Sequence, residues 1–190
     1  MTKTFNLADL FESVVDTVPA DREALICGEQ RLSYSELESR ANQLAHFFQS
    51  RGVNAGDHIG LYMYNCNEYL EAMWACFKIR AVPINVNYRY VKDELLYVFD
   101  NANMVAVVHG REFVPAIADI QASATGVHTY IAVDDRSDES LAPIDAIDYE
   151  AAVASGDNAR DFSARSDDDL FILYTGGTTG MPKGVMWPHK

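Results

Sequence analysis

Cysteine is scarce in this chain: there are three among 190 residues, Cys27, Cys66 and Cys76, far apart and without a C-x-x-C pair. So few scattered thiols do not suit a disulfide framework or a zinc site, and we expect reduced cysteines. A long apolar run is also missing, and the first 20 residues carry three acidic side chains and no small-residue cleavage site. We therefore expect neither a signal peptide nor a membrane-spanning helix, and we expect a cytoplasmic location.

Basic residues are few as well: 15 Lys and Arg stand against 28 Asp and Glu, and the net charge is −13. This balance argues against a nucleic-acid partner, because phosphate backbones recruit basic surfaces. The excess of acid is greatest over residues 134–169, where twelve acidic side chains accompany three arginines. Their spacing matches no metal-ligand pattern, which favours a solvated connecting segment over a metal or partner site.

Apolar residues make up 48% of the chain and aromatic residues 11%, which is typical of a globular protein with a real core. The pattern of apolar residues alternates between strand and helix spacing. It predicts a hairpin at 24–34, helices at 33–52, 67–77, 94–100 and 112–123, and strands at 58–64, 82–86, 104–108 and 129–133. Such alternation indicates an α/β layered domain with a mostly parallel sheet and flanking helices.

Two helix starts are predicted within this pattern. Ser33 and Glu36 have the spacing of a capping box at the start of the first long helix, and Asn67 is a candidate cap of the next. Four of the five histidines are dispersed, without the spacing of a metal site. The fifth, His189, follows Pro188, and both a pocket-lining role and a place at the start of a further helix stay open for it.

The most informative stretch is a glycine- and threonine-rich loop that ends in a lysine, between two apolar segments, 171–174 and 185–187, that both read as strands. Glycines allow backbone N–H groups to approach an anion, threonine hydroxyls add donors, and a lysine neutralises oligophosphate charge. The pattern is not a Walker A motif, which requires G-x-x-x-x-G-K-[ST] between a strand and a helix. The loop therefore predicts a phosphate site formed by Thr175, Gly176, Gly177, Thr178, Thr179, Gly180 and Lys183.

Residues 174–185 resemble the signature Y-T-[SG]-G-[TS]-T-G-x-P-K-G-V of the adenylate-forming (AMP-binding) superfamily. Upstream segments at 32–37, 41–45, 52–57 and 81–89 resemble the opening blocks of acyl-CoA synthetases in the same order, so that the likeness spans nearly the whole chain. Two departures stand out. Gly176 stands where many members have serine, which removes one hydroxyl donor, and Arg80 stands where glycine is usual at a helix end.

The resemblance implies ATP-dependent activation of a carboxylic acid to an acyl-adenylate, followed by thioester formation on coenzyme A. By carry-over from the family, the loop residues bind the phosphates, Lys183 is the catalytic residue, and Thr175 contacts Mg²⁺. The amino-acid sequence of the loop resembles that of fatty-acyl or steroid-side-chain CoA synthetases more than that of amino-acid adenylation domains. Two alternatives stay open: an adenylation domain that loads a carrier protein, and a non-catalytic remnant that serves as a binding module.

The resemblance also implies that residues 1–190 are the N-terminal part of the AMP-binding domain, with a phosphate loop at 174–184 and the C-terminal domain absent. We therefore expect the isolated chain to be inactive. We also expect it to form a homo-oligomer, by default a symmetric dimer, through the apolar strands on either side of the loop.

Overall fold

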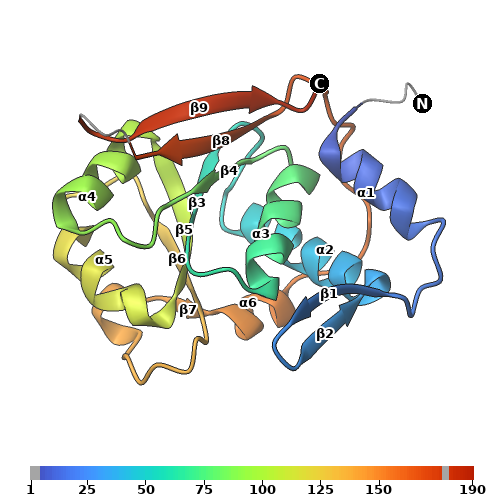
Figure 1. The fold of residues 1–190 in the computed structure, drawn as a ribbon, viewed down its shortest axis with the longest axis horizontal. Helices are drawn as coiled ribbons and strands as arrows, with labels where there is room; N and C mark the ends of the chain where they lie inside the picture. Colours follow the sequence, from blue (N-terminus) through green and yellow to red (C-terminus); the bar gives the residue numbers. More distant parts are fainter. Residues whose placement is uncertain (1–4, 177–179) are drawn as a thin grey trace.

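Strands form the centre of the structure, a computed structural model that describes residues 5–176 and 180–190. Within these ranges they are β1 (Glu23–Cys27), β2 (Gln30–Ser33), β3 (His58–Tyr62), β4 (Val82–Asn85), β5 (Met104–Gly110), β6 (Thr129–Val133), β7 (Ile147–Asp148), β8 (Leu170–Thr175) and β9 (Lys183–Pro188). β1 and β2 form a separate hairpin, and the others form one sheet in the order β7-β6-β5-β3-β4-β8-β9 (Figure 1). Neighbouring strands of this sheet are parallel except β8 and β9, so the predicted mostly parallel sheet is confirmed.

Helices cover both faces of this sheet (Figure 1). In the described ranges they are α1 (Leu7–Val15), α2 (Tyr34–Ser50), α3 (Asn67–Lys78), α4 (Lys92–Asn101), α5 (Val114–Gln121) and α6 (Tyr149–Ser155), with 3₁₀ turns at Arg111–Phe113 and Ala142–Ile144. Apolar residues of α2, α3 and α6 pack on one face, and those of α4 and α5 on the other. No helix of the described chain is both long and apolar enough to cross a membrane.

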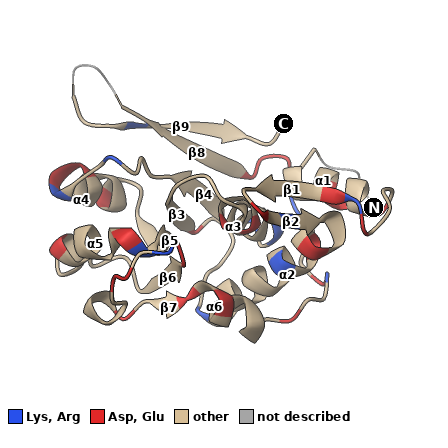
Figure 2. Cartoon of the chain, turned by 60° about the horizontal axis from the view of Figure 1, so that its bottom comes forward, with Lys and Arg blue, Asp and Glu red and all other residues tan. Residues whose placement is uncertain are grey.

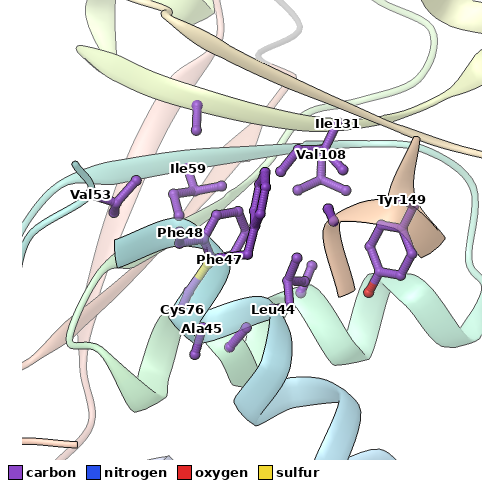
Figure 3. Packing of buried hydrophobic residues seen from close by; sticks show 14 of the residues in the cluster. Leu44, Ala45, Phe47, Phe48, Val53, Ile59, Cys76, Val108, Ile131 and Tyr149 are labelled. Atoms are coloured by element: carbon purple, nitrogen blue, oxygen red, sulfur yellow. The ribbon is translucent and has the colours of Figure 1, made fainter. Parts of the chain in front are cut away.

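The core consists of two clusters, one on each face of the sheet. In the first, Phe47 and Phe48 of α2 lie against Ile59, Val108 and Ile131 of three adjacent strands, as Figure 3 shows. Because helices cover both faces, the central strands are buried on both sides and their sequences are continuously apolar. This explains why the run in β5 could be recognised as a buried strand.

Most predicted elements occur where expected, with shifted ends. The capping box is present: the Ser33 side chain accepts from the Glu36 backbone N–H, and the Glu36 carboxylate accepts from the Ser33 N–H. The prediction that Asn67 caps the next helix was wrong, because α3 already begins at Asn67 and its N-cap is Cys66, whose side chain makes no capping bond. The acidic segment 134–169 contains β7 and α6 in addition to connecting chain.

A buried group of charges joins α1, α2 and α3. The Lys78 side chain is fully buried, and its Nζ lies 2.6 Å from Glu12 Oε1 and 2.9 Å from the Glu38 carboxylate. Arg165 also donates to Glu12, and Arg160 to Glu38, so each carboxylate has two cationic partners. These contacts hold the pKa of Glu12 below its usual value despite burial. Figure 2 shows blue and red segments interspersed around α1 and α2, whereas β8 and β9 carry almost no charge.

Candidate functional site

The glycine- and threonine-rich loop connects β8 to β9, as the sequence predicted. In this antiparallel pair Thr175 lies opposite Lys183, and Tyr174 lies opposite Gly184. β8 is parallel to β4, so the loop emerges at the edge of the sheet where the parallel strands have their carboxyl ends. This is the edge at which open α/β sheets bind their ligands.

Side chains of β4 and α4 hold the end of β8 in place. The Tyr174 backbone N–H donates to Asn85 Oδ1 at 2.8 Å, and the Tyr174 hydroxyl donates to Asn101 Oδ1 at 2.7 Å. The Tyr174 ring covers Gly184, where a Cβ would lie only 3.0 Å from ring carbon Cε2. Gly184 is therefore glycine because of close packing across the hairpin, and this packing aligns the two strands that carry the loop.

Asp169 holds the start of β8. Arg80 donates to it from Nε at 3.0 Å and from an Nη at 2.8 Å, and Asn6 Nδ2 donates to it at 3.0 Å. Arg80 has a φ of +64°, the left-handed conformation that the sequence suggested for this helix end. Its guanidinium compensates for the strain, because no glycine could make the bidentate contact with Asp169.

Thr175, Gly176 and Lys183 are exposed at the two ends of the loop. Within the described residues neither Thr175 nor Lys183 uses its side chain in a hydrogen bond or ion pair. Residues directly opposite each other in an antiparallel pair point to the same face, about 5 Å apart at Cβ, so a hydroxyl donor and a cation stand side by side. Of the other predicted phosphate ligands, Gly180 lies in the described loop, whereas Gly177, Thr178 and Thr179 lie outside the described residues.

Tyr90 is a residue near the loop that sequence reasoning missed. It follows β4, its side chain is buried, and its hydroxyl has no hydrogen-bond partner among the described residues. A Cβ built on Gly176 lies 4.0 Å from this hydroxyl. No local pattern marks Tyr90, because its position depends on the pairing of β4 with β8; the resemblance of segment 81–89 to the family was the only signal at this place.

His189 is not at the loop. Its Nδ1 accepts from the Leu7 backbone N–H at 3.2 Å, and its ring packs edge-on against Phe77. Burial lowers the pKa of the imidazole, which favours the neutral form that accepts this hydrogen bond. His189 therefore connects the end of the β8–β9 hairpin to the first turn of α1.

A separate cavity of about 260 Å³ lies at the carboxyl ends of β3, β5 and β6, beside the β1–β2 turn. Its lining carries carboxylates of Glu29, Glu68, Asp134 and Asp135 against one arginine, a lining that repels a triphosphate. Cys66 also lines it, and burial raises the pKa of this thiol to about 12, so it is not a thiolate nucleophile at neutral pH. Among the described residues no three His, Cys, Asp or Glu side chains are placed to hold a metal ion.

Comparison with curated proteins identifies relatives that are named as CoA ligases. The chain is 50% identical over 97% of its length to a 3-oxocholest-4-en-26-oate–CoA ligase of Rhodococcus rhodochrous, and covers 33% of that protein. It is 46% identical over its full length to a medium/long-chain-fatty-acid–CoA/3-oxocholest-4-en-26-oate–CoA ligase of Mycobacterium marinum, of which it covers 35%. The chain thus spans about a third of the length of the curated relatives that it matches.

Solved structures agree on the fold. The anthranilate CoA ligase AuaEII, in complex with anthranoyl-AMP, superposes with a TM-score of 0.89 at 19% identity, over 100% of this chain and 36% of that one. A Rhodopseudomonas palustris protein assigned as a long-chain-fatty-acid CoA ligase superposes with a TM-score of 0.83 at 26% identity, over 100% of this chain and 46% of that one. The family model for the AMP-binding enzyme matches residues 11–190. The chain therefore belongs to the AMP-binding enzyme family.

Proposed function

We propose that this chain supplies the triphosphate-binding part of an enzyme that activates a carboxylic acid with ATP and transfers the acyl group to coenzyme A. The observation that carries the proposal is the exposed pair of Thr175 and Lys183, opposite each other at the mouth of a glycine-rich loop. Both side chains are free of partners among the described residues, and both are donors suited to phosphate oxygens. Membership of the AMP-binding family supports the same role.

In the proposed reaction a carboxylate oxygen attacks the α-phosphorus of ATP, and pyrophosphate leaves. The thiol of coenzyme A then attacks the acyl carbon, and AMP leaves. Lys183 and the loop backbone N–H groups neutralise the charge that builds up on the departing pyrophosphate. Mg²⁺ would add to this neutralisation; the described residues offer it the Thr175 hydroxyl, and nucleotide phosphates would supply the remaining ligands.

For the acid we propose a fatty acid or a steroid with a carboxylated side chain, the two classes that appear in the names of the similar ligases. A relative that is named as a synthase rather than as a CoA ligase, a linear gramicidin synthase of Brevibacillus parabrevis, is 27% identical over 90% of this chain. The higher identity to CoA ligases favours coenzyme A over a carrier protein as acceptor. We also propose a cytoplasmic location, since ATP and coenzyme A are substrates.

A chimera tests the proposal. Residues 1–190 replace the matching segment of the Rhodococcus rhodochrous ligase, and thioester formation is measured with 3-oxocholest-4-en-26-oate, a medium-chain fatty acid, and either coenzyme A or a carrier protein as acceptor. We expect an active chimera that uses coenzyme A and depends on Lys183. A folded but inactive chimera would support the alternative of a non-catalytic binding module, and an active chimera insensitive to Lys183→Ala would overturn the role proposed for Lys183.

We further propose that the isolated chain forms a homodimer. Leu173, Met181, Val185, Met186 and Trp187 are all at least 40% exposed, and they lie on or beside the β8–β9 hairpin. β9 is one of the two edge strands of the described sheet and can pair with another strand. Light scattering at micromolar concentration in 0.15 M salt should show the mass of a dimer, and a monomer mass without exposed apolar surface would contradict this.

A further inference from the structure

Tyr90 carries an unused hydrogen-bond donor next to the phosphate loop. The residue is 8% exposed, and its hydroxyl oxygen is buried without a partner among the described residues. A buried hydroxyl without a partner costs about 1–3 kcal/mol. Such a group calls for an explanation in a site that binds anions.

Two hydrogen bonds hold the backbone of Tyr90 in place. The Tyr90 carbonyl accepts a hydrogen bond from the Tyr62 hydroxyl at 2.9 Å, and the Tyr90 backbone N–H donates to the Asn87 carbonyl at 2.9 Å. The phenol therefore projects from a rigid turn after β4. The Tyr90 hydroxyl oxygen lies 4.0 Å from the position that a Cβ on residue 176 would occupy.

The Tyr90 hydroxyl is placed to substitute for a hydroxyl that residue 176 lacks. Gly176 has no side chain, whereas a serine there would put its hydroxyl within hydrogen-bond reach of Tyr90, since Oγ lies about 1.4 Å beyond Cβ. Burial and the nearby Glu94 carboxylate raise the pKa of the Tyr90 hydroxyl, so it remains a protonated donor at neutral pH. A protonated donor that has no partner in residues 5–176 and 180–190 thus stands beside Gly176, the loop position without a hydroxyl.

We propose that Tyr90 is a phosphate-binding residue, whose hydroxyl donates a hydrogen bond to a triphosphate oxygen held between Thr175 and Lys183 and so replaces the hydroxyl that Gly176 lacks. This inference rests on the proposed triphosphate site and adds a residue that lies 86 positions before Gly176 in the sequence. It also explains why a buried tyrosine, and not a phenylalanine, stands at a position where the hydroxyl has no partner in the described part of the chain.

The test is calorimetric titration of residues 1–190 with inorganic tripolyphosphate and with ATP. Tyr90→Phe removes only the hydroxyl, and we expect it to weaken Kd about tenfold, the effect of one hydrogen bond to a charged group. Gly176→Ser in the Tyr90→Phe background should restore Kd to within about threefold of the wild-type value. Tyr130→Phe is the matched control, because it removes another buried hydroxyl without a partner among the described residues, on β6 and separated from β8 by three strands, and it should leave Kd unchanged.

The outcomes separate this inference from the function on which it rests. If Lys183→Ala weakens binding but Tyr90→Phe does not, the hydroxyl is satisfied by water alone and the inference is overturned while the triphosphate site stands. If Tyr90→Phe weakens binding without rescue by Gly176→Ser and lowers the melting temperature, its role is structural, and the inference is again overturned. If the wild-type chain does not bind, or Lys183→Ala binds as well as the wild type, the triphosphate site and the inference fail together.

Discussion

Two lysines in this chain illustrate two uses of the same side chain. Lys78 is fully buried and lies within 3 Å of Glu12 and Glu38, whereas Lys183 is exposed at the end of the loop and pairs with no carboxylate in the described ranges. The charge of Lys78 is satisfied inside the protein, so that it can hold α1, α2 and α3 together. The charge of Lys183 is available to an anion from outside. Internal pairing, rather than the residue type, distinguishes a structural cation from a binding one.

The largest effect is expected at the buried lysine. Lys78→Ala removes the cation that Glu12 and Glu38 share, and we expect it to lower the free energy of unfolding by about 3–5 kcal/mol. Urea denaturation of residues 1–190 measures it. Lys78→Met keeps the apolar stem and should lose less, because it leaves a smaller cavity than alanine does. A loss below about 1 kcal/mol for Lys78→Ala would show that the buried pairs do not hold the helices.

The exposed lysine should show the opposite pattern. Lys183→Ala in the active chimera should lower kcat/KM for ATP by about two to four kcal/mol of transition-state stabilisation, or roughly 30- to 1000-fold. Its free energy of unfolding should stay within about 0.5 kcal/mol of the wild type, because the side chain has no internal partner among the described residues. Lys92→Ala is the matched control, an exposed lysine at the first residue of α4. Equal activity of the Lys183→Ala and Lys92→Ala chimeras would refute the proposed role.

His109 is a third kind of ionisable group, one whose burial outweighs both the nearby Asp135 charge and its hydrogen bond with the Gly110 carbonyl. His109 is fully buried, makes no ion pair among the described residues, and burial lowers its pKa to about 4. Because an unfolded imidazole titrates near pH 6.5, the unfolded chain takes up the proton first as the pH falls. The contribution of His109 to stability is therefore complete above pH 6.5 and is lost progressively towards pH 4, by about 3 kcal/mol.

Urea denaturation at pH 7 and at pH 5 measures this loss. His109→Gln cannot be protonated, so the stability of this variant should change much less between the two pH values than that of the wild type. A wild-type chain that is equally stable at pH 7 and pH 5 would contradict the prediction, as would the same pH dependence in both proteins.

The smallest effect is expected at the packing that aligns the loop. Gly184→Ala places a methyl group 3.0 Å from the Tyr174 ring, and we expect it to cost about 1–3 kcal/mol of stability through overpacking. Gly28→Ala is the control for crowding, because nothing lies within 4 Å of its Cβ position, although its φ of +57° carries a backbone cost of its own. Because Tyr174→Leu also removes the hydrogen bond to Asn101, the two substitutions are compared in a double-mutant cycle. A smaller cost of Gly184→Ala in the Tyr174→Leu background than in the wild type would identify the ring contact as the cause, and an equal cost would argue against it.

The elements and the loop could be predicted from the sequence because their signals are local. The Ser33–Glu36 capping box, the apolar run of β5 and the phosphate-loop residues each lie within about ten consecutive positions. Asn67 shows the limit of such signals, since an asparagine favours a cap but cannot specify at which residue the helix begins. His189 shows another limit: a pocket-lining role and a place at the start of a further helix were considered for it, and neither involves the hydrogen bond that joins it to Leu7.

The sequence by itself determined the alternation of strands and helices, the glycine- and threonine-rich composition of the loop and the family, because each depends on residues that are neighbours along the chain. Only the tertiary structure decided what surrounds the loop. Asn85 holds Tyr174 and Tyr90 lies beside Gly176 because β4 pairs with β8, and Arg80 binds Asp169 because α3 ends next to the start of β8. Strand order and helix packing depend on the total apolar surface that is buried across the whole sheet. This total cannot be deduced from the local spacing of residues.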